Sequence, residues 1–110
     1  MNIELDESQL LALAGSDQSL LLPIVEDFSM DGLGLIDKME RARADGDIES
    51  YQACVHQLKG SSGSLGMMSV YESCVKLEQA GEEDVAEDCL SALREQLQGS
   101  VQLALSCLRG

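Results

Sequence analysis

The sequence predicts an all-α protein, an up-and-down antiparallel four-helix bundle with a short extra N-terminal helix. Two long stretches repeat apolar residues every three or four positions, which is the spacing of helices that pack into a bundle. Short connections between the later helices favour antiparallel neighbours. No strand pattern competes with these helices. The 110 residues suit one domain, 1–110, with one continuous core.

The first two helices are predicted from caps and periodicity. Asp6 can cap a short first helix, with Gln9 three residues on. Gly15 ends this helix, and Ser16 or Asp17 can cap the next one. The second helix runs to about residue 44, because seven residues follow one another at spacings of four and three: Leu21, Val25, Phe28, Gly32, Leu35, Met39 and Ala42.

Two glycines fall inside the second helix. Gly32 occupies a position of the apolar seam, where a neighbouring helix can approach closely, whereas Gly34 has no such role. Because glycine weakens a helix interior, the sequence leaves open whether this helix breaks locally at Asp31-Gly32. Such a break would bend the helix.

The third helix carries the only histidine of the chain. Asp45-Gly46-Asp47 is a short turn, and Asp47 can cap a helix that continues to about Leu65. At about 100° per residue, one side of this helix becomes an apolar stripe, and His56 lies outside it. The stripe consists of Tyr51, Val55, Leu58, Ser62 and Leu65.

Two capping-box sequences predict the last two helices. Ser69-Val70-Tyr71-Glu72 begins a fourth helix that ends near Gly81 and carries Val70, Cys74 and Leu77 on one face. Asp84-Val85-Ala86-Glu87 begins the last helix, which Gly99 can soften. This helix contains the second long seam, made of Ala86, Leu90, Leu93, Leu97, Val101, Ala104 and Leu108.

The composition limits the class of partner. Twenty acidic and seven basic residues give a net charge of −13, which argues against nucleic acid and anionic membrane surfaces. The N-terminus lacks the pattern of a signal peptide, and no run of 18 apolar residues could span a membrane. We therefore expect a cytoplasmic monomer whose partners are proteins.

The cysteines predict no metal site. Cys54, Cys74, Cys89 and Cys107 form no C-x-x-C pair, and the chain has no second histidine. In a reducing compartment these four residues would be small core or boundary residues.

The residues around His56 indicate phosphoryl chemistry. An exposed imidazole is a nucleophile that can accept and release a phosphoryl group. Lys59, one turn on, would be the nearby cation that offsets the incoming negative charge. Gly60 and Gly63 leave little side-chain bulk on this side, although each glycine costs a helix about 1 kcal/mol relative to alanine. We expect the glycines to keep the approach open for a large partner.

The stretch His56-Gln57-Leu58-Lys59-Gly60-Ser61-Ser62-Gly63-Ser64-Leu65-Gly66 resembles the motif of a known family. This is the family of histidine-containing phosphotransfer (HPt) domains of multistep two-component phosphorelays, with the motif H-x-L-K-G-S-(S/A)-x-x-L-G. Asp47 stands where the family tends to start this helix, and a Leu77-Glu78 pair follows the histidine by about 22 residues. The resemblance covers essentially the whole chain. It is weakest in the second helix, where the family prefers larger residues than Gly32 and Gly34.

The resemblance implies a phosphocarrier without autonomous turnover. His56 would accept a phosphoryl group from a receiver-domain aspartate and pass it to the receiver domain of another response regulator. Lys59 would stabilise the phosphoryl group, and Glu78 would be a hydrogen-bond partner of the ring. The expected partners are response-regulator receiver domains and a hybrid sensor histidine kinase. The receivers would supply Mg²⁺, so we expect no cofactor in this chain. Four residues are expected to contact a docked partner: Gln52, Lys59, Gly60 and Gly63.

Two other functions stay open at the level of sequence. A helical adaptor could bind a signalling protein through the same face without phosphorylation, although the presence of both His56 and Lys59 speaks against it. A histidine-dependent phosphatase or a Cys/His metal enzyme would need a second acid, base or ligand near His56, and only Glu78 is available. Lys59-Gly60-Ser61-Ser62 has the wrong residue order for a Walker phosphate-binding loop.

Overall fold

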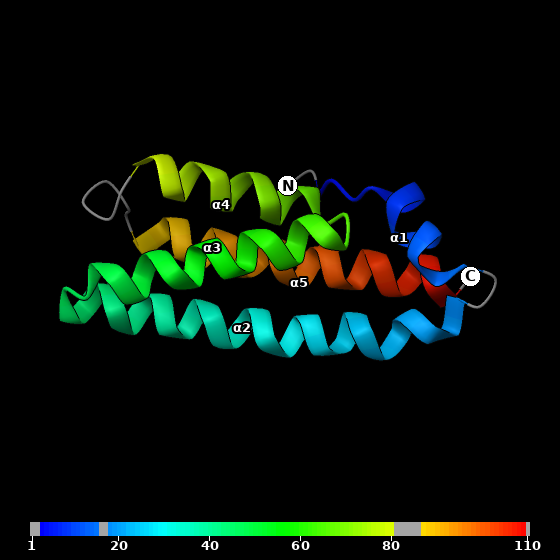
Figure 1. The fold of residues 1–110 in the computed structure, drawn as a ribbon, viewed down its shortest axis with the longest axis horizontal. Coiled ribbons are helices and arrows are strands. Elements are labelled where there is room, and N and C mark those ends of the chain that lie inside the picture. The colour runs from blue at the N-terminus through cyan, green and yellow to red at the C-terminus, as the bar shows by residue number, and fades with distance from the viewer. Residues whose placement is uncertain (1–2, 16–17, 81–86, 110) are drawn as a thin grey trace.

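The computed structural model describes residues 3–15, 18–80 and 87–109, and these residues form helices and no strand. Four long helices run alternately up and down (Figure 1), as the sequence predicts. The elements are α1 (Glu7–Ala14), the 3₁₀ helix η1 (Gln18–Leu20), α2 (Leu21–Asp45), α3 (Ile48–Ser64), α4 (Met68–Ala80) and α5 (Glu87–Arg109).

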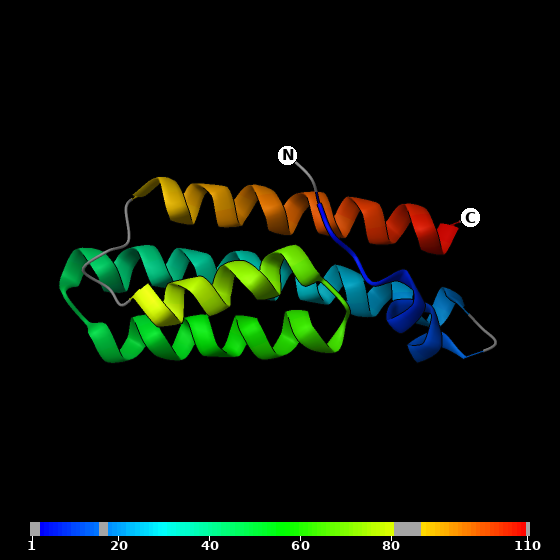
Figure 2. The same cartoon turned by 90° about the horizontal axis from the view of Figure 1, so that it is seen from above.

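The four long helices stand at the corners of a square. Each packs on two neighbours, so that α3 lies diagonally opposite α5, and α2 lies opposite α4 (Figures 1 and 2). The short helix α1 lies at the end of the bundle where α2 begins and α5 ends. This arrangement places α3 between α2 on one side and α4 on the other.

The helix α1 is capped as predicted. The carboxylate of Asp6 accepts a hydrogen bond from the backbone N–H of Gln9 at 3.0 Å, and Gly15 follows the last residue with a positive φ of 63°. The predicted cap of the next helix, Ser16 or Asp17, lies outside the described residues. The described residue before α2 is Leu20, which makes no side-chain cap.

The helix α2 is continuous through Asp31-Gly32, where the sequence left a local break open. All seven predicted seam residues of α2 are buried. A Cβ atom on Gly32 would lie 2.8 Å from Cδ2 of Leu97 on α5, so the missing side chain lets α2 and α5 approach closely. The packing energy gained in this way offsets the low helix propensity of glycine. Gly34 meets no such neighbour, since nothing lies within 4 Å of its Cβ position.

The helix α3 begins as predicted and ends one residue early. The carboxylate of Asp47 accepts hydrogen bonds from the backbone N–H of Ser50 at 3.2 Å and from its hydroxyl at 2.7 Å. These bonds, the one from the hydroxyl first, lower the pKa of Asp47. The predicted apolar stripe is buried in full. The chain leaves the helix through Leu65 and Gly66, whose φ of 73° is left-handed.

The predicted capping box at Ser69 is wrong. The helix α4 begins at Met68, and the hydroxyl of Ser69 accepts a hydrogen bond from the N–H of Glu4 at 2.6 Å. The N–H of Ser69 donates in turn to the carbonyl of Glu4 at 3.2 Å. The N-terminal segment, distant in sequence, therefore takes the hydroxyl that the sequence pattern assigned to a cap. Val70, Cys74 and Leu77 are buried as predicted.

The last helix carries the second seam. The six seam residues that the structure describes, from Leu90 to Leu108, are buried, and α5 continues through Gly99. A Cβ atom on Gly99 would lie 3.2 Å from the side chain of Ile3, so this glycine makes room for the N-terminal segment. The predicted end of the fourth helix at Gly81 lies outside the described residues, and so do residues 84–86 of the predicted capping box. The last residue of that box, Glu87, is where α5 begins.

The N-terminal segment also fixes the end of α3. The amide side chain of Gln9 donates to the carbonyls of Gly63 and Ser64 at 2.7 and 3.1 Å, and the N–H of Asp6 donates to the carbonyl of Gly66 at 2.8 Å. These carbonyls belong to the last turn of a helix and the turn after it, where the helix itself supplies no partner. The histidine helix is thus held at both ends.

The cysteines partly follow the prediction. Cys54 and Cys74 are buried and Cys107 is half-buried, but Cys89 is exposed, which differs from the core or boundary position expected for it. All four are free thiols. Among the described residues, no group of three or more His, Cys, Asp or Glu is placed to hold a metal ion. In the same residues no helix is long and apolar enough to cross a membrane.

Candidate functional site

His56 stands on the solvent side of α3. Its side chain is 77% exposed, while Val55 and Leu58 on either side are buried in the core. The buried neighbours fix the rotation of the helix, so the imidazole is presented to solvent from a rigid backbone. This is the position that the apolar stripe predicts.

Glu78 on α4 brings His56 and Lys59 together. One carboxylate oxygen, Oε1, lies 3.3 Å from Nδ1 of His56, and the other, Oε2, accepts a hydrogen bond from Nζ of Lys59 at 2.9 Å. A carboxylate can only accept at such a contact, so Nδ1 carries the proton. In the described part of the chain no hydrogen bond engages Nε2. We call these three residues the His56 cluster.

The charges of the cluster are mutually stabilised. The hydrogen bond from Lys59 is the main cause that lowers the pKa of Glu78, and the contact with His56 adds to it. The same bond raises the pKa of Lys59. Burial beneath the cluster raises the pKa of the Cys74 thiol to about 12, and the charge of Glu78 acts in the same direction. Glu78 and Lys59 are therefore ionised at neutral pH, and Cys74 is neutral.

The two glycines near His56 have different surroundings. Nothing lies within 4 Å of the Cβ position of Gly60, so this part of the helix surface is open, as expected. A Cβ atom on Gly63 would lie 3.2 Å from Cδ2 of Tyr71 on α4. Gly63 therefore makes room for the ring of Tyr71, which differs from the open clearance expected of it. Gln52 is exposed on α3, one turn before His56.

The ion pair between Lys59 and Glu78 was not predicted from the sequence. Lys59 was expected to face an incoming phosphoryl group and Glu78 to face the ring, whereas in the structure the two side chains also bind each other. The opposite charges of Lys59 and Glu78, together with the expectation that both side chains face His56, could have predicted this ion pair.

The family model described as "Hpt domain" matches residues 23–103. The chain belongs to the Hpt domain family. This membership gives it a phosphotransfer role in two-component signalling. Hpt domains are phosphocarriers rather than enzymes.

Proteins similar to this Hpt domain include a sensor protein and a solved phosphotransfer protein. Sensor protein TorS of Escherichia coli (strain K12) is 42% identical over 52 residues, which are 47% of this chain and 6% of TorS. The crystal structure of histidine-containing phosphotransfer protein B (HptB) from Pseudomonas aeruginosa PAO1 matches with a TM-score of 0.72 at 20% identity. It covers 96% of this chain and 91% of HptB. At that identity, HptB supports the fold.

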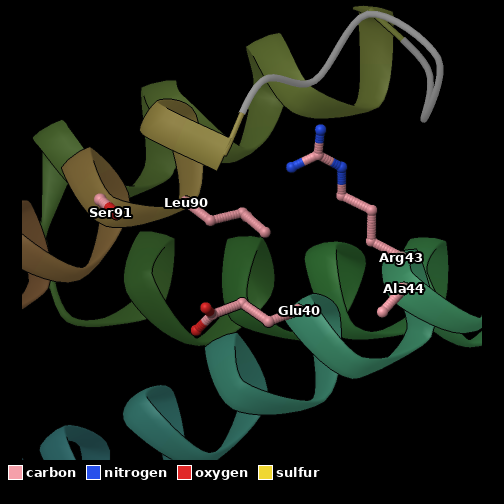
Figure 3. A pocket seen from close by; sticks show the side chains of 5 residues that line it. All are labelled: Glu40, Arg43, Ala44, Leu90 and Ser91. Carbon is pink, nitrogen blue, oxygen red and sulfur yellow. The ribbon is translucent and has the colours of Figure 1, made fainter.

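This Hpt domain also has a cavity of about 460 Å³ that does not adjoin the His56 cluster. Its walls come from the C-terminal part of α2 and the N-terminal part of α5 (Figure 3), and α5 is diagonally opposite α3. The lining residues are Glu40, Arg43, Ala44, Leu90 and Ser91. Glu40 is itself paired with Arg94. The cavity contains no residue of the predicted site.

Proposed function

We propose that this Hpt domain is a phosphocarrier in a multistep phosphorelay and that His56 is the residue that carries the phosphoryl group. The observation that supports this most directly is the arrangement of the ring. The imidazole is exposed, its Nδ1 faces the carboxylate of Glu78, and its Nε2 is not engaged by the described residues. A nucleophile oriented by a third group in this way is prepared for attack.

In the proposed reaction, Nε2 of His56 attacks the phosphorus of an aspartyl phosphate on a receiver domain. A phosphorus–nitrogen bond forms, and the bond between phosphorus and the aspartate oxygen breaks, so that the electron pair leaves with the aspartate carboxylate. The proton on Nδ1 stays in place, and the ring gains a positive charge that faces Glu78. The reverse reaction passes the phosphoryl group to an aspartate of another receiver domain.

Lys59 is proposed to assist the transfer electrostatically. Its ammonium lies in the same cluster as the ring, held by Glu78 at 2.9 Å. A lysine binds phosphate as a mobile point charge, so it can turn toward the phosphoryl oxygens while its stem stays on α3. It forms no bond in the reaction, so its loss slows the transfer and leaves the chemistry intact.

The divalent cation of the reaction is proposed to come from the partner. Phosphoryl transfer requires a divalent cation and acidic ligands for it, and we propose that the receiver provides both, with Mg²⁺ as the cation. The domain, residues 1–110, would act as a monomer. Gln52 and Gly60 are exposed beside the ring and are the proposed contacts on α3 itself.

A relay assay tests this function. One receiver domain is phosphorylated with acetyl [³²P]phosphate and freed of the small donor, and a second, unlabelled receiver is added with or without this Hpt domain. We expect label to reach the second receiver only when the Hpt domain is present. If the presence of the Hpt domain makes no difference, or if it remains bound to receivers without taking label, it is an adaptor and the proposal is wrong.

A further inference from the structure

The C-terminal end of α3 is weak as a helix by its own sequence. Residues 60–64 read Gly-Ser-Ser-Gly-Ser, and the two glycines lower the helix propensity of this stretch. The hydroxyl of each serine donates to a carbonyl four residues back, at 3.1, 2.8 and 3.0 Å, a contact that slightly destabilises and bends helices. The stretch directly follows Lys59 and begins with the open surface at Gly60. Its order therefore affects what a partner meets beside His56.

The side chain of Gln9 on α1 holds the end of this stretch. Its amide nitrogen donates to the carbonyls of Gly63 and Ser64 at 2.7 and 3.1 Å. Both carbonyls lie in the last turn of α3, where a helix supplies no further N–H to its own carbonyls. The N–H of Gly66 also reaches the carbonyl of Gly63, but at 3.3 Å. The shorter of these two bonds thus comes from outside the helix.

Gln9 is fixed in place by its surroundings. Its backbone N–H donates to the carboxylate of Asp6 at 3.0 Å, and the next residue, Leu10, is buried in the core. The N-terminal segment that leads into α1 passes beside the turn between α3 and α4 (Figures 1 and 2). Two hydrogen bonds between Glu4 and Ser69 attach the segment there, at the start of α4. The amide of Gln9 is therefore presented to α3 from a position that other helices define.

We propose that Gln9 is a positioning residue for phosphoryl transfer. By holding the last turn of α3, it keeps Lys59 and the surface at Gly60 in the arrangement that a receiver domain meets. In an α-helix the N–H of Gly63 bonds to the carbonyl of Lys59, so an unwound last turn loosens the segment that carries both features. His56 lies two turns before Gly63, so the reactivity of its ring does not depend on Gln9. The inference rests on the phosphocarrier function above and deepens it by adding a residue of α1 that acts through α3.

This role predicts a separation between docking and chemistry. When only a fraction of the molecules has the last turn of α3 formed, the apparent affinity for a receiver falls in proportion to that fraction. A receiver at high concentration selects the helical form, so the maximal rate of transfer is retained. Phosphoramidate is too small to need docking, so its reaction with His56 does not depend on this turn.

Three variants test the donor of Gln9. Gln9→Met removes the amide but keeps a side chain of similar length and helix propensity. Gln9→Arg supplies new donors for the same carbonyls, and a cation is favoured at the C-terminus of a helix. Gln98→Met is the matched control, because Gln98 is an exposed glutamine of α5, which lies diagonally opposite α3.

Hydrogen exchange and single-turnover transfer from a phosphorylated receiver are measured on the parent and each variant. In Gln9→Met the amides of Leu65 and Gly66 should lose protection at least about fivefold, the factor that one net hydrogen bond contributes. The receiver concentration for half-maximal transfer should rise at least about threefold. The maximal rate and the labelling by phosphoramidate should stay within about twofold of the parent, the range of surface substitutions that disturb no essential contact. Gln9→Arg and Gln98→Met should stay within the same range in every measurement.

The contrary results are distinct. If Gln9→Met loses protection while its transfer from the receiver matches the parent, Gln9 has only a structural role and this inference is overturned. It is also overturned if protection is unchanged, if Gln9→Arg behaves as Gln9→Met does, or if Gln98→Met reproduces the loss. If the parent takes no label from either donor, the phosphocarrier function itself fails, and this inference fails with it.

Discussion

Glu78 holds Lys59 with a hydrogen bond of 2.9 Å beside the ring of His56, so the cation of the site is already paired before any phosphoryl group arrives. The pair joins α3 to α4 at the height of the histidine. Because Glu78 also contacts Nδ1, the same carboxylate positions both the ring and the ammonium.

The first prediction concerns the charge state of Glu78. The hydrogen bond from Lys59 is the main cause of its lowered pKa, so Lys59→Ala should raise the pKa of Glu78 toward the ordinary value of about 4.3. Carboxyl-carbon NMR titration measures this directly. An unchanged titration would show that the pair does not form in solution.

The sign of the associated pH effect follows from the directions of the two shifts. The pKa of Glu78 is lower in the folded than in the unfolded protein, so the carboxylate stabilises the fold at pH values above its unfolded-state pKa. This stabilisation is lost as the pH falls through the folded-state pKa. The pKa of Lys59 is higher in the folded than in the unfolded protein, so the ammonium stabilises the fold at pH values below its unfolded-state pKa. This stabilisation is lost as the pH rises through the folded-state pKa. Relative to Lys59→Ala, the parent should therefore lose its added stability in acid below about pH 4 and in alkali above about pH 10.4. Urea unfolding at a series of pH values measures the difference, and a difference that does not vary with pH would contradict the pairing.

The second prediction concerns the tautomer of His56. In the parent, the contact with Glu78 keeps the proton of the neutral ring on Nδ1. Glu78→Ala should move the ring toward a mixture of tautomers, which ¹⁵N NMR of the imidazole resolves. Glu72→Ala, an exposed glutamate on the same helix, is the control and should have no effect. A parent ring protonated mainly on Nε2 would contradict the proposed attacking atom.

The third prediction separates the two glycines of α3. Gly60→Ala should stabilise the domain by about 1 kcal/mol, because alanine is a better helix former than glycine. The added methyl group would meet no neighbour within 4 Å. Gly63→Ala should stabilise it less or destabilise it, since the ring of Tyr71 must move from 3.2 Å. Urea unfolding compares them. Equal gains would mean that Tyr71 does not pack on Gly63.

The rate of transfer from a receiver tests whether the open surface at Gly60 contacts the partner. Gly60→Gln places a long side chain beside His56, so it should slow transfer from a receiver while labelling by phosphoramidate persists. If receiver transfer stays at the parental rate, the open surface at Gly60 is not used by the partner.

The fourth prediction uses the glycines of α2. A Cβ at position 32 would lie 2.8 Å from the buried side chain of Leu97, and overpacking of this kind costs about 1–3 kcal/mol. Gly34→Ala meets no neighbour and should gain about 1 kcal/mol. Gly32→Ala should therefore be clearly less stable than Gly34→Ala in urea. Equal stability would remove the packing explanation for the continuity of α2.

The sequence predicts this fold well because its main signals are local. The seams of α2 and α5, the cap at Asp47 and the stripe that excludes His56 all depend on residues a few positions apart, which a helix brings together by its own geometry. The position of Glu78 opposite His56 was available from the family motif. Each of these expectations agrees with the structure.

The errors arise where distant segments meet. The continuity of α2 depends on Leu97 of α5, and the hydroxyl of Ser69 is taken by the backbone of Glu4. Gly63 on α3 faces the ring of Tyr71 on α4. No periodicity within one helix contains this information, because tertiary contacts override local preference.

The central claim is that His56 carries the phosphoryl group. The most direct measurement is phosphopeptide mapping by mass spectrometry, under neutral to alkaline conditions that preserve phosphohistidine, after the parent and His56→Gln have each been incubated with a phosphorylated receiver domain. We predict one phosphoryl group on the peptide that contains His56 in the parent, and none in the variant, whose fold should be unchanged because the side chain is exposed. A phosphoryl group on His56→Gln, or on another residue of the parent, would contradict the account.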